Sequence, residues 1–224
     1  MLKRAQAAAV LCLALAAPLA HAGAQAYEPL AADVRAGLAS ALADNPAPRH
    51  GFADSIEAVN WLAAMSSRLE KRIPEYRSRL DFLRTVHYES VRAGLDPQLV
   101  LAVIHVESNF RKYAVSGAGA RGFMQVMPFW TSLIGQTVDN LFRLRTNLRY
   151  GCVILKHYVE VENGNIERAL ARYNGSLGKP EYPRMVFGAL QGTWRYGSTT
   201  SAGAKPPDQA PARNQVGKRP AIVS

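Results

Sequence analysis

The apolar stretch from Leu99 to Val106 constrains the fold of this chain more than any other segment. Asp96-Pro97 stands just before it, with Asp96 suited to an N-cap and Pro97 suited to the first helical turn. These signals predict a helix from residue 97 to about residue 108 that is apolar on nearly every side. Such a helix belongs in the core of a soluble domain, so the rest of the chain must supply the elements that surround it.

Helical spacing of apolar residues recurs along the chain, and no long stretch alternates apolar and polar residues as a half-buried strand does. Besides 97–108, the segments expected to be helical are 32–42, 54–72, 74–93, 128–134, 147–161, 165–174 and 184–191. Pro180, Tyr182 and Pro183 predict a surface loop before the last of them. The sequence therefore indicates an all-α fold. Three helical acids, Glu160, Glu162 and Glu167, are expected to face solvent.

The N-terminus has the pattern of a secretory signal peptide. Lys3 and Arg4 precede an apolar segment, 7–19, that is too short to span a bilayer. Small residues then offer A-x-A cleavage sites ending at Ala22 and at Ala26. We expect a signal peptide of residues 1–22, or of 1–26 if the second site is used. The mature protein would be periplasmic or secreted, with no stable membrane insertion after cleavage.

Composition divides the remaining chain into three parts. Residues 23–50 form an N-terminal leader, Ala-rich and loosely attached, that ends in the breaker cluster Asn45-Pro46-Ala47-Pro48. Residues 51–196 form a single domain, and residues 197–224 form a basic tail whose Ser, Thr, Gly and Pro content predicts disorder. With Cys12 in the signal peptide, Cys152 is left alone, so no intramolecular disulfide is possible. We expect a monomer.

Charge and motif content restrict the partners. The chain carries 27 Lys and Arg against 17 Asp and Glu, a net charge of +10. A basic exported protein is attracted to anionic polymers such as cell-wall glycopeptide. Nucleic acid is not expected as a partner, because the basic residues are dispersed and do not alternate with aromatic ones. No His, Cys or Asp cluster has metal-ligand spacing and no phosphate loop is present, so neither metal nor cofactor is expected.

Glu107 is the candidate catalytic residue. It follows Val103 by one helical turn and Val100 by two, so its carboxyl group should lie in apolar surroundings. Burial raises the pKa of a carboxyl group, as a general acid requires. No other Asp or Glu occurs between Glu107 and Asp139, which suits a glycosidase site with one acid. The alternative is a glutamate that only caps or pairs at a helix end.

Four segments carry a resemblance to a known family. They are Glu107-Ser108, the run Gly122-Phe123-Met124-Gln125-Val126-Met127-Pro128, the pair Asn147 and Gly151, and Tyr173-Asn174. In this order and spacing they resemble the SLT-type lytic transglycosylases, lysozyme-like enzymes similar to glycoside hydrolase family 23. The likeness covers about Ala93 to Val186. Arg172 departs from it by replacing the usual alanine before the tyrosine, and Asn174-Gly175-Ser176 replaces Asn-Ala-Gly.

The resemblance implies a role for each matched residue. Glu107 would be the acid and base, and Ser108 an orienting hydroxyl. Ser116 would contact the sugar near the cleaved bond, Met124 and Gln125 would line the substrate groove, and Tyr173 would lie close to the acid with Asn174 beside it. Asn147 and Gly151 would pack a helix behind the site. Trp130 is the best candidate for stacking on a sugar, whereas Trp61 and His105 are expected to be satisfied structural residues.

The implied fold is a single lysozyme-like catalytic domain, and the implied reaction is non-hydrolytic cleavage of peptidoglycan glycan strands. It would break the β-1,4 bond between N-acetylmuramic acid and N-acetylglucosamine and leave a 1,6-anhydro sugar. Two alternatives stay open: a hydrolytic lysozyme of the same fold, and a non-catalytic wall-binding protein. Both general wall turnover and service to an envelope-spanning secretion or conjugation machine fit the sequence.

Overall fold

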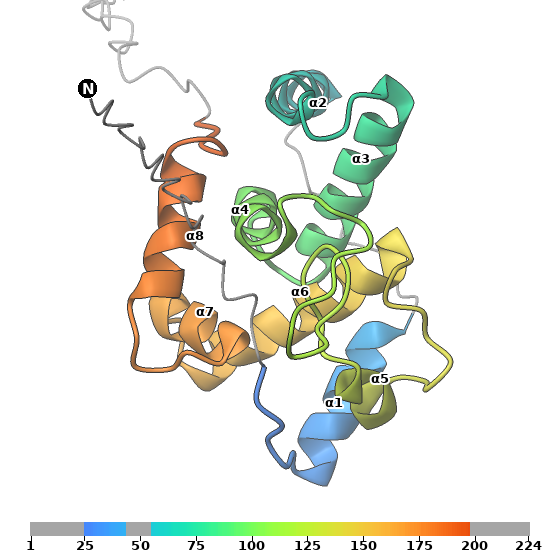
Figure 1. Ribbon diagram of the computed structural model, residues 1–224, viewed down its shortest axis with the longest axis vertical. Coiled ribbons are helices and arrows are strands. Elements are labelled where there is room, and N and C mark those ends of the chain that lie inside the picture. Colours follow the sequence, from blue (N-terminus) through green and yellow to red (C-terminus); the bar gives the residue numbers. More distant parts are fainter. Residues whose placement is uncertain (1–24, 44–54, 198–224) are drawn as a thin grey trace, which may run out of the picture.

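The computed structural model describes residues 25–43 and 55–197 of the 224-residue chain (Figure 1). The expected signal peptide, the breaker cluster at 45–48 and the tail beyond residue 197 lie outside them. The described ranges contain helices α1 (Ala32–Leu42), α2 (Ser55–Leu69), α3 (Tyr76–Arg92), α4 (Pro97–Ser108), α5 (Phe129–Ile134), α6 (Leu144–Val161), α7 (Ile166–Asn174) and α8 (Glu181–Gln191). Within these ranges the only β pairing is a pair of isolated bridges. The expected all-α class is confirmed.

Helix α4 occupies the centre, with α3 on one side and α8 on the other (Figure 1). Its residues from Leu99 to Ile104 are all buried, as an all-round apolar helix requires. The Asp96 side chain accepts a hydrogen bond from the Gln98 backbone N–H at 2.8 Å, which confirms the expected cap. Asn109 ends the helix in a left-handed conformation, with φ of 48°.

Helix α6 joins the other layers, because it packs against α1, α3 and α7. Its buried face includes Leu148, Ile154 and Leu155. The loop between α4 and α5 folds back on itself through antiparallel bridges that pair Arg121 with Val115 and with Val126. This loop and the central helix α4 carry most of the residues singled out for function.

The leader is more closely joined to the domain than its composition predicted. Helix α1 has the expected bounds and packs against α5 and α6. Leu38 belongs to the hydrophobic core at 8% exposure, and Gln25 is buried at 4%. Gln25 contacts Met127 and Trp130, which lie 102 and 105 positions away, and the helix that carries Leu38 packs on the distant α5 and α6. Such long-range contacts cannot be recognised from local composition.

Several expected boundaries differ from the structure. Helix α3 begins at Tyr76, because Glu75 caps it by accepting from the backbone N–H groups of Arg77 and Ser78. Helix α6 begins at Leu144 and not at residue 147. Helix α8 begins at Glu181, so the expected loop through Tyr182 and Pro183 is wrong. Proline is tolerated there because the N–H groups of the first helical turn have no intrahelical acceptor.

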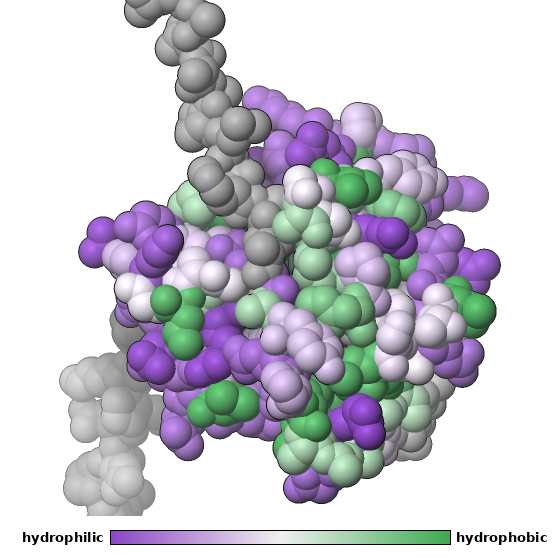
Figure 2. Space-filling model, turned by 60° about the horizontal axis from the view of Figure 1, so that its bottom comes forward, coloured by the Kyte–Doolittle hydropathy of each residue, from purple (hydrophilic) through white to green (hydrophobic). Residues whose placement is uncertain are grey.

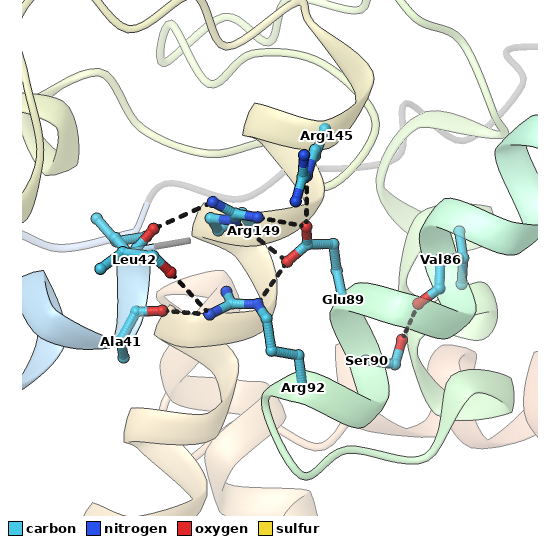
Figure 3. A network of polar contacts seen from close by, with 9 residues as sticks. Ala41, Leu42, Val86, Glu89, Ser90, Arg92, Arg145 and Arg149 are labelled. Carbon is cyan, nitrogen blue, oxygen red and sulfur yellow. Dashed lines mark hydrogen bonds and ion pairs between the residues drawn. The ribbon is translucent and has the colours of Figure 1, made fainter. Parts of the chain in front are cut away.

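A buried carboxylate, Glu89, joins three helices (Figure 3). Its oxygens accept from Arg92 at 2.8 Å, from Arg145 at 3.3 Å and from Arg149 at 3.0 Å. The same arginines reach the end of α1: Arg92 donates to the Ala41 carbonyl and Arg149 to the Leu42 carbonyl. Because Glu89 is fully buried, these charge-assisted bonds hold α3, α6 and α1 together.

The surface of the described domain is mixed. On the face that Figure 2 shows, hydrophobic and hydrophilic residues both reach the surface. None of the helices in the described ranges has both the length and the apolar character needed to cross a bilayer.

The Glu89 cluster yields a stability prediction. Glu89→Ala should lower the free energy of unfolding by about 3–5 kcal/mol, because it leaves buried guanidinium groups without their counter-charge. Glu160→Ala is the matched control, since its ion pair with Lys156 on α6 is largely exposed and should cost about 1 kcal/mol or less. Urea unfolding followed by circular dichroism measures both, and equal losses would contradict the structural role of Glu89.

Candidate active site

Glu107 lies in the last turn of α4 and is 4% exposed. Its Oε1 atom accepts a hydrogen bond of 2.7 Å from the Tyr182 hydroxyl, which comes from the first turn of α8. The packing of α8 on α4 makes this contact across 75 positions of sequence. Val100 and Val103, which precede Glu107 on its helix face, are fully buried, so the carboxyl group has the apolar setting that the spacing predicted.

A second tyrosine lies close to the same carboxyl group. Tyr173 on α7 is fully buried, and its hydroxyl donates to the Met124 carbonyl at 2.7 Å. Burial raises the pKa of Tyr173 and Tyr182 well above the ordinary tyrosine value, and the negative charge of Glu107 raises both further. Both hydroxyls therefore stay protonated throughout the physiological range of pH, and both can donate their hydrogen bonds there.

The loop after α4 is fastened to α6 by Asn147. The Asn147 Oδ1 atom accepts from the Met124 backbone N–H at 2.8 Å, and Nδ2 donates to the Arg121 and Leu141 carbonyls. Gly122 has a positive φ of 74°, and a Cβ there would lie 2.5 Å from the Asn147 side chain. Asn147 thus satisfies three backbone groups that would otherwise be buried without partners.

Met124 and Gln125 shape this loop from inside and do not present open surface to a ligand. The Met124 side chain is fully buried against Gly151, whose Cβ, if present, would come within 2.8 Å of the Met124 Cβ. Gln125 is 2% exposed and has a left-handed φ of 50°. Its Nε2 donates to the Ala114 and Gly122 carbonyls. The role that the resemblance implied for these two side chains, lining a groove, does not match this placement.

Of the remaining expected site residues, Ser108 and Ser116 make hydrogen bonds within the protein, whereas Asn174 has an amide nitrogen without one. Ser108 is buried, and its hydroxyl donates to the Ile104 carbonyl in the preceding turn. Ser116 is half-buried and accepts from the Ala120 backbone N–H at 3.1 Å, which stabilises the tip of the loop. Asn174 is 8% exposed, and its Nδ2 is buried with no hydrogen-bond partner among the described residues. Of the three, Asn174 has the side-chain donor best suited to a ligand.

Two further carboxylates, Asp139 and Glu162, have partners of their own. Asp139 accepts a 2.5 Å hydrogen bond from the Tyr150 hydroxyl and also accepts from the Gln136 backbone. Glu162, expected to face solvent, is in fact 8% exposed and binds Arg168 and Arg172. Across the described ranges, no three His, Cys, Asp or Glu side chains gather as metal ligands.

The expected structural residues are satisfied as predicted. His105 lies between Arg72, whose Nη2 is 2.8 Å from Nε2, and the Trp194 indole, which donates to Nδ1. Burial, and then the charge of Arg72, lowers the His105 pKa. Trp61 donates to Gln98 at 3.1 Å. The expected sugar-stacking role of Trp130 does not match its placement, because Trp130 is only 2% exposed and its indole N–H donates to Gln25 of the leader at 3.0 Å.

Fold and site together define an all-helical domain that presents one buried acid held by a tyrosine at the end of its central helix. Comparison with known families identifies the domain. Residues 84–182 match the family model described as the Transglycosylase SLT domain. Residues 84–182 thus resemble the SLT domain, the type that the motifs indicated. Glu107, Tyr173 and Tyr182 all fall within it.

Known relatives match over parts of their length. The transglycosylase of Enterobacteria phage PRD1 is 30% identical over 103 residues, which are 46% of this chain and 38% of that protein. The membrane-bound lytic murein transglycosylase C of Glaesserella parasuis serovar 5 (strain SH0165) is 48% identical over 54 residues, 24% of this chain and 15% of the relative. The matched stretches thus cover well under half of either relative.

One solved structure is also similar. It is the X-ray structure of an inactive mutant of the lytic transglycosylase Slt from Pseudomonas aeruginosa, at 28% identity and a TM-score of 0.40. The match covers 52% of this chain and 19% of that chain.

The contact between Gly151 and Met124 predicts a steric effect. Gly151→Ala should destabilise the protein by about 1–3 kcal/mol, because the new methyl group overlaps Met124 and must displace the site loop. Gly188→Ala is the matched control on α8, where an added Cβ meets nothing within 4 Å. It should stabilise by about 0.5–1 kcal/mol through helix propensity. Thermal unfolding compares them, and similar effects from both substitutions would contradict close packing at Gly151.

The raised tyrosine pKa values predict a loss of stability at high pH. Above pH about 10 the unfolded chain ionises its tyrosines, whereas native Tyr173 and Tyr182 keep their protons. The native state then binds more protons, so the free energy of unfolding falls as pH rises, by about 1.4 kcal/mol per pH unit for each tyrosine. Below pH about 10 both states are protonated and the contribution is complete. Tyr182→Phe should make this decline shallower in urea titrations from pH 9 to 11.5; an unchanged slope would show that Tyr182 is not responsible.

Proposed function

We propose that this chain is a peptidoglycan lytic transglycosylase. The observation that carries the proposal is the Glu107 carboxyl group, buried at the end of α4 and bonded to the Tyr182 hydroxyl at 2.7 Å. The SLT domain match and the transglycosylase names of its relatives support the same activity. The substrate would be the β-1,4 bond between N-acetylmuramic acid and N-acetylglucosamine in cell-wall glycan.

Glu107 would act twice in the reaction. Its carboxylic acid first gives a proton to the glycosidic oxygen, the C1–O bond breaks, and positive charge develops on the muramic acid ring. The C6 hydroxyl of the same sugar then attacks C1, and the Glu107 carboxylate takes the hydroxyl proton. The acid is restored and no water is consumed. The product is a 1,6-anhydro sugar, as the family resemblance implies.

The commitment of the other carboxylates favours this reaction over hydrolysis. A hydrolytic lysozyme needs a second acid that positions water or acts as a nucleophile. Asp139 is bonded to Tyr150, Glu162 to two arginines, and Glu89 to three. None of these three is left to activate a water molecule beside Glu107. A purely wall-binding protein would have no need to bury an acid and hold it with a tyrosine hydroxyl.

The proposed substrate contacts follow from side chains with donors or hydroxyls near the acid. Asn174 offers a buried amide nitrogen without a described partner. Ser116 is proposed to contact the sugar, and Tyr173, buried with its hydroxyl on the Met124 carbonyl, to act by holding the loop. Ser108, Met124 and Gln125 would act indirectly, because they hold the loop in shape. The signal-peptide pattern supports action in the periplasm or outside the cell. We propose that the protein acts there on glycan strands as a monomer.

The direct test replaces the acid. Glu107→Gln should fold normally and lose at least about 10²-fold in the rate of muropeptide release from purified sacculi, because it removes the general acid and base. Glu160→Gln, on the exposed side of α6, is the matched control and should retain full rate. Mass spectrometry of the products should find 1,6-anhydro ends, 18 Da lighter than hydrolytic products. Reducing ends would indicate a lysozyme, and full activity of Glu107→Gln would refute the assignment of the acid.

A further inference from the structure

The leader places a buried side-chain amide beside the candidate active site. The Gln25 Oε1 atom accepts from the Met127 backbone N–H at 3.2 Å and from the Trp130 indole N–H at 3.0 Å. Met127 follows Met124 by three residues, and the Met124 carbonyl accepts from the Tyr173 hydroxyl at 2.7 Å. Gln25 therefore binds the same loop that Tyr173 binds.

Neighbouring leader residues extend this contact along the domain. The Tyr27 ring meets Phe129 edge to face, with centroids 5.6 Å apart, and Glu28 pairs with Arg172 at 3.0 Å. Arg172 is the residue that departs from the family pattern, so the departure supplies a partner for this chain's own leader. Figure 1 shows the segment passing between α7 and the loop that follows α4. The segment thus contacts the loop after α4, helix α5 and helix α7.

The chemistry of the position suits an acetamido group. Two N–H donors, on Met127 and Trp130, converge on one carbonyl oxygen, and the Gln25 side chain that supplies it ends in CH₂–C(=O)–NH₂. The N-acetyl groups of cell-wall sugars present the same carbonyl and amide nitrogen. We propose that Gln25 is an intramolecular stand-in for a substrate acetamido group, so that the leader and the glycan compete for this position. The inference rests on the proposed function, because it takes N-acetylated glycan as the ligand.

The contact between the leader and the domain is weak enough for a ligand to displace it. The Gln25 Nε2 atom is buried without a hydrogen-bond partner among the described residues, which weakens the contact. Tyr27 is 62% exposed and the Glu28 carboxylate is 46% exposed, so these two anchors add little. Helix α1, packed on α5 and α6, keeps the segment close by and gives it a high effective concentration. A glycan that satisfies more groups could therefore displace it.

Competition predicts that releasing the leader strengthens glycan binding. Gln25→Ala and Glu28→Ala, made in the protein that begins after the first expected cleavage site, Ala22, and so keeps Gln25, should each bind tetra-N-acetylchitotetraose more tightly. The gain for Gln25→Ala should be about threefold to thirtyfold, the value of up to two hydrogen bonds of ordinary strength, and the gain for Glu28→Ala should be smaller. Asp33→Ala is the matched control, because it removes the same charge from the exposed first turn of α1. It should leave the dissociation constant unchanged. Isothermal titration calorimetry measures all four proteins.

A second measurement observes the displacement directly. In ¹⁵N-labelled protein, the side-chain amide signals of Gln25 are those missing from Gln25→Ala. Their chemical shifts should change to those of a solvent-exposed glutamine as the oligosaccharide saturates the wild type. Unchanged or weaker binding by Gln25→Ala, no binding by any variant, or signals that stay fixed at saturation would overturn the inference. The two proposals fail separately. Wild type that cuts sacculi but gains nothing from Gln25→Ala refutes only the leader, whereas tighter binding without any muropeptide release refutes only the activity.

Discussion

Burial of α4 on all sides is the constraint from which the rest of the structure follows. A helix with six consecutive buried residues, Leu99–Ile104, has to be covered by other elements, and α3 and α8 supply that cover. The same burial puts Glu107 at 4% exposure where the helix ends. A carboxyl group in that position costs free energy unless it is hydrogen-bonded, and the Tyr182 hydroxyl on α8 meets this need. Packing and chemistry therefore depend on one helix–helix contact.

The loop after α4 is held in shape by a few side chains. Its backbone turns through the left-handed conformations of Gly122 and Gln125, so it lacks the regular hydrogen bonds of a helix or sheet. Asn147 replaces three of them, and Tyr173 satisfies the Met124 carbonyl. The motif residues that resemble a substrate-binding set are thus mostly the ones that give the loop its shape. A shared motif can be required for the architecture of a site without touching the ligand.

Local signals predicted most of the fold. The cap expected at Asp96 is confirmed, and the helix expected over 165–174 is α7, capped by Asn165 and ended by Gly175. Tyr182, Glu89 and Glu162 were missed because their importance comes from partners that lie distant in sequence or on another helix. Pro180 and Pro183 looked like loop residues, although proline fits the first turn of a helix as well as a loop. The resemblance singled out Glu107 and Tyr173, which the structure places on α4 and α7 as buried side chains; their catalytic roles stay a prediction.

The leader also makes contacts with distant residues that its local sequence does not predict. Nothing in its Ala-rich composition distinguishes Gln25 from any other polar residue near a cleavage site, yet its amide is buried against residues 102 and 105 positions away. Arg172 looked like a neutral departure from the family pattern and instead joins Glu162 of α6's end to Glu28 of the leader. A substitution that leaves the catalytic groups intact can thus change what competes for them. In the proposed competition, the residues shared with the SLT family supply the chemistry, and Arg172, which differs, binds the competing leader.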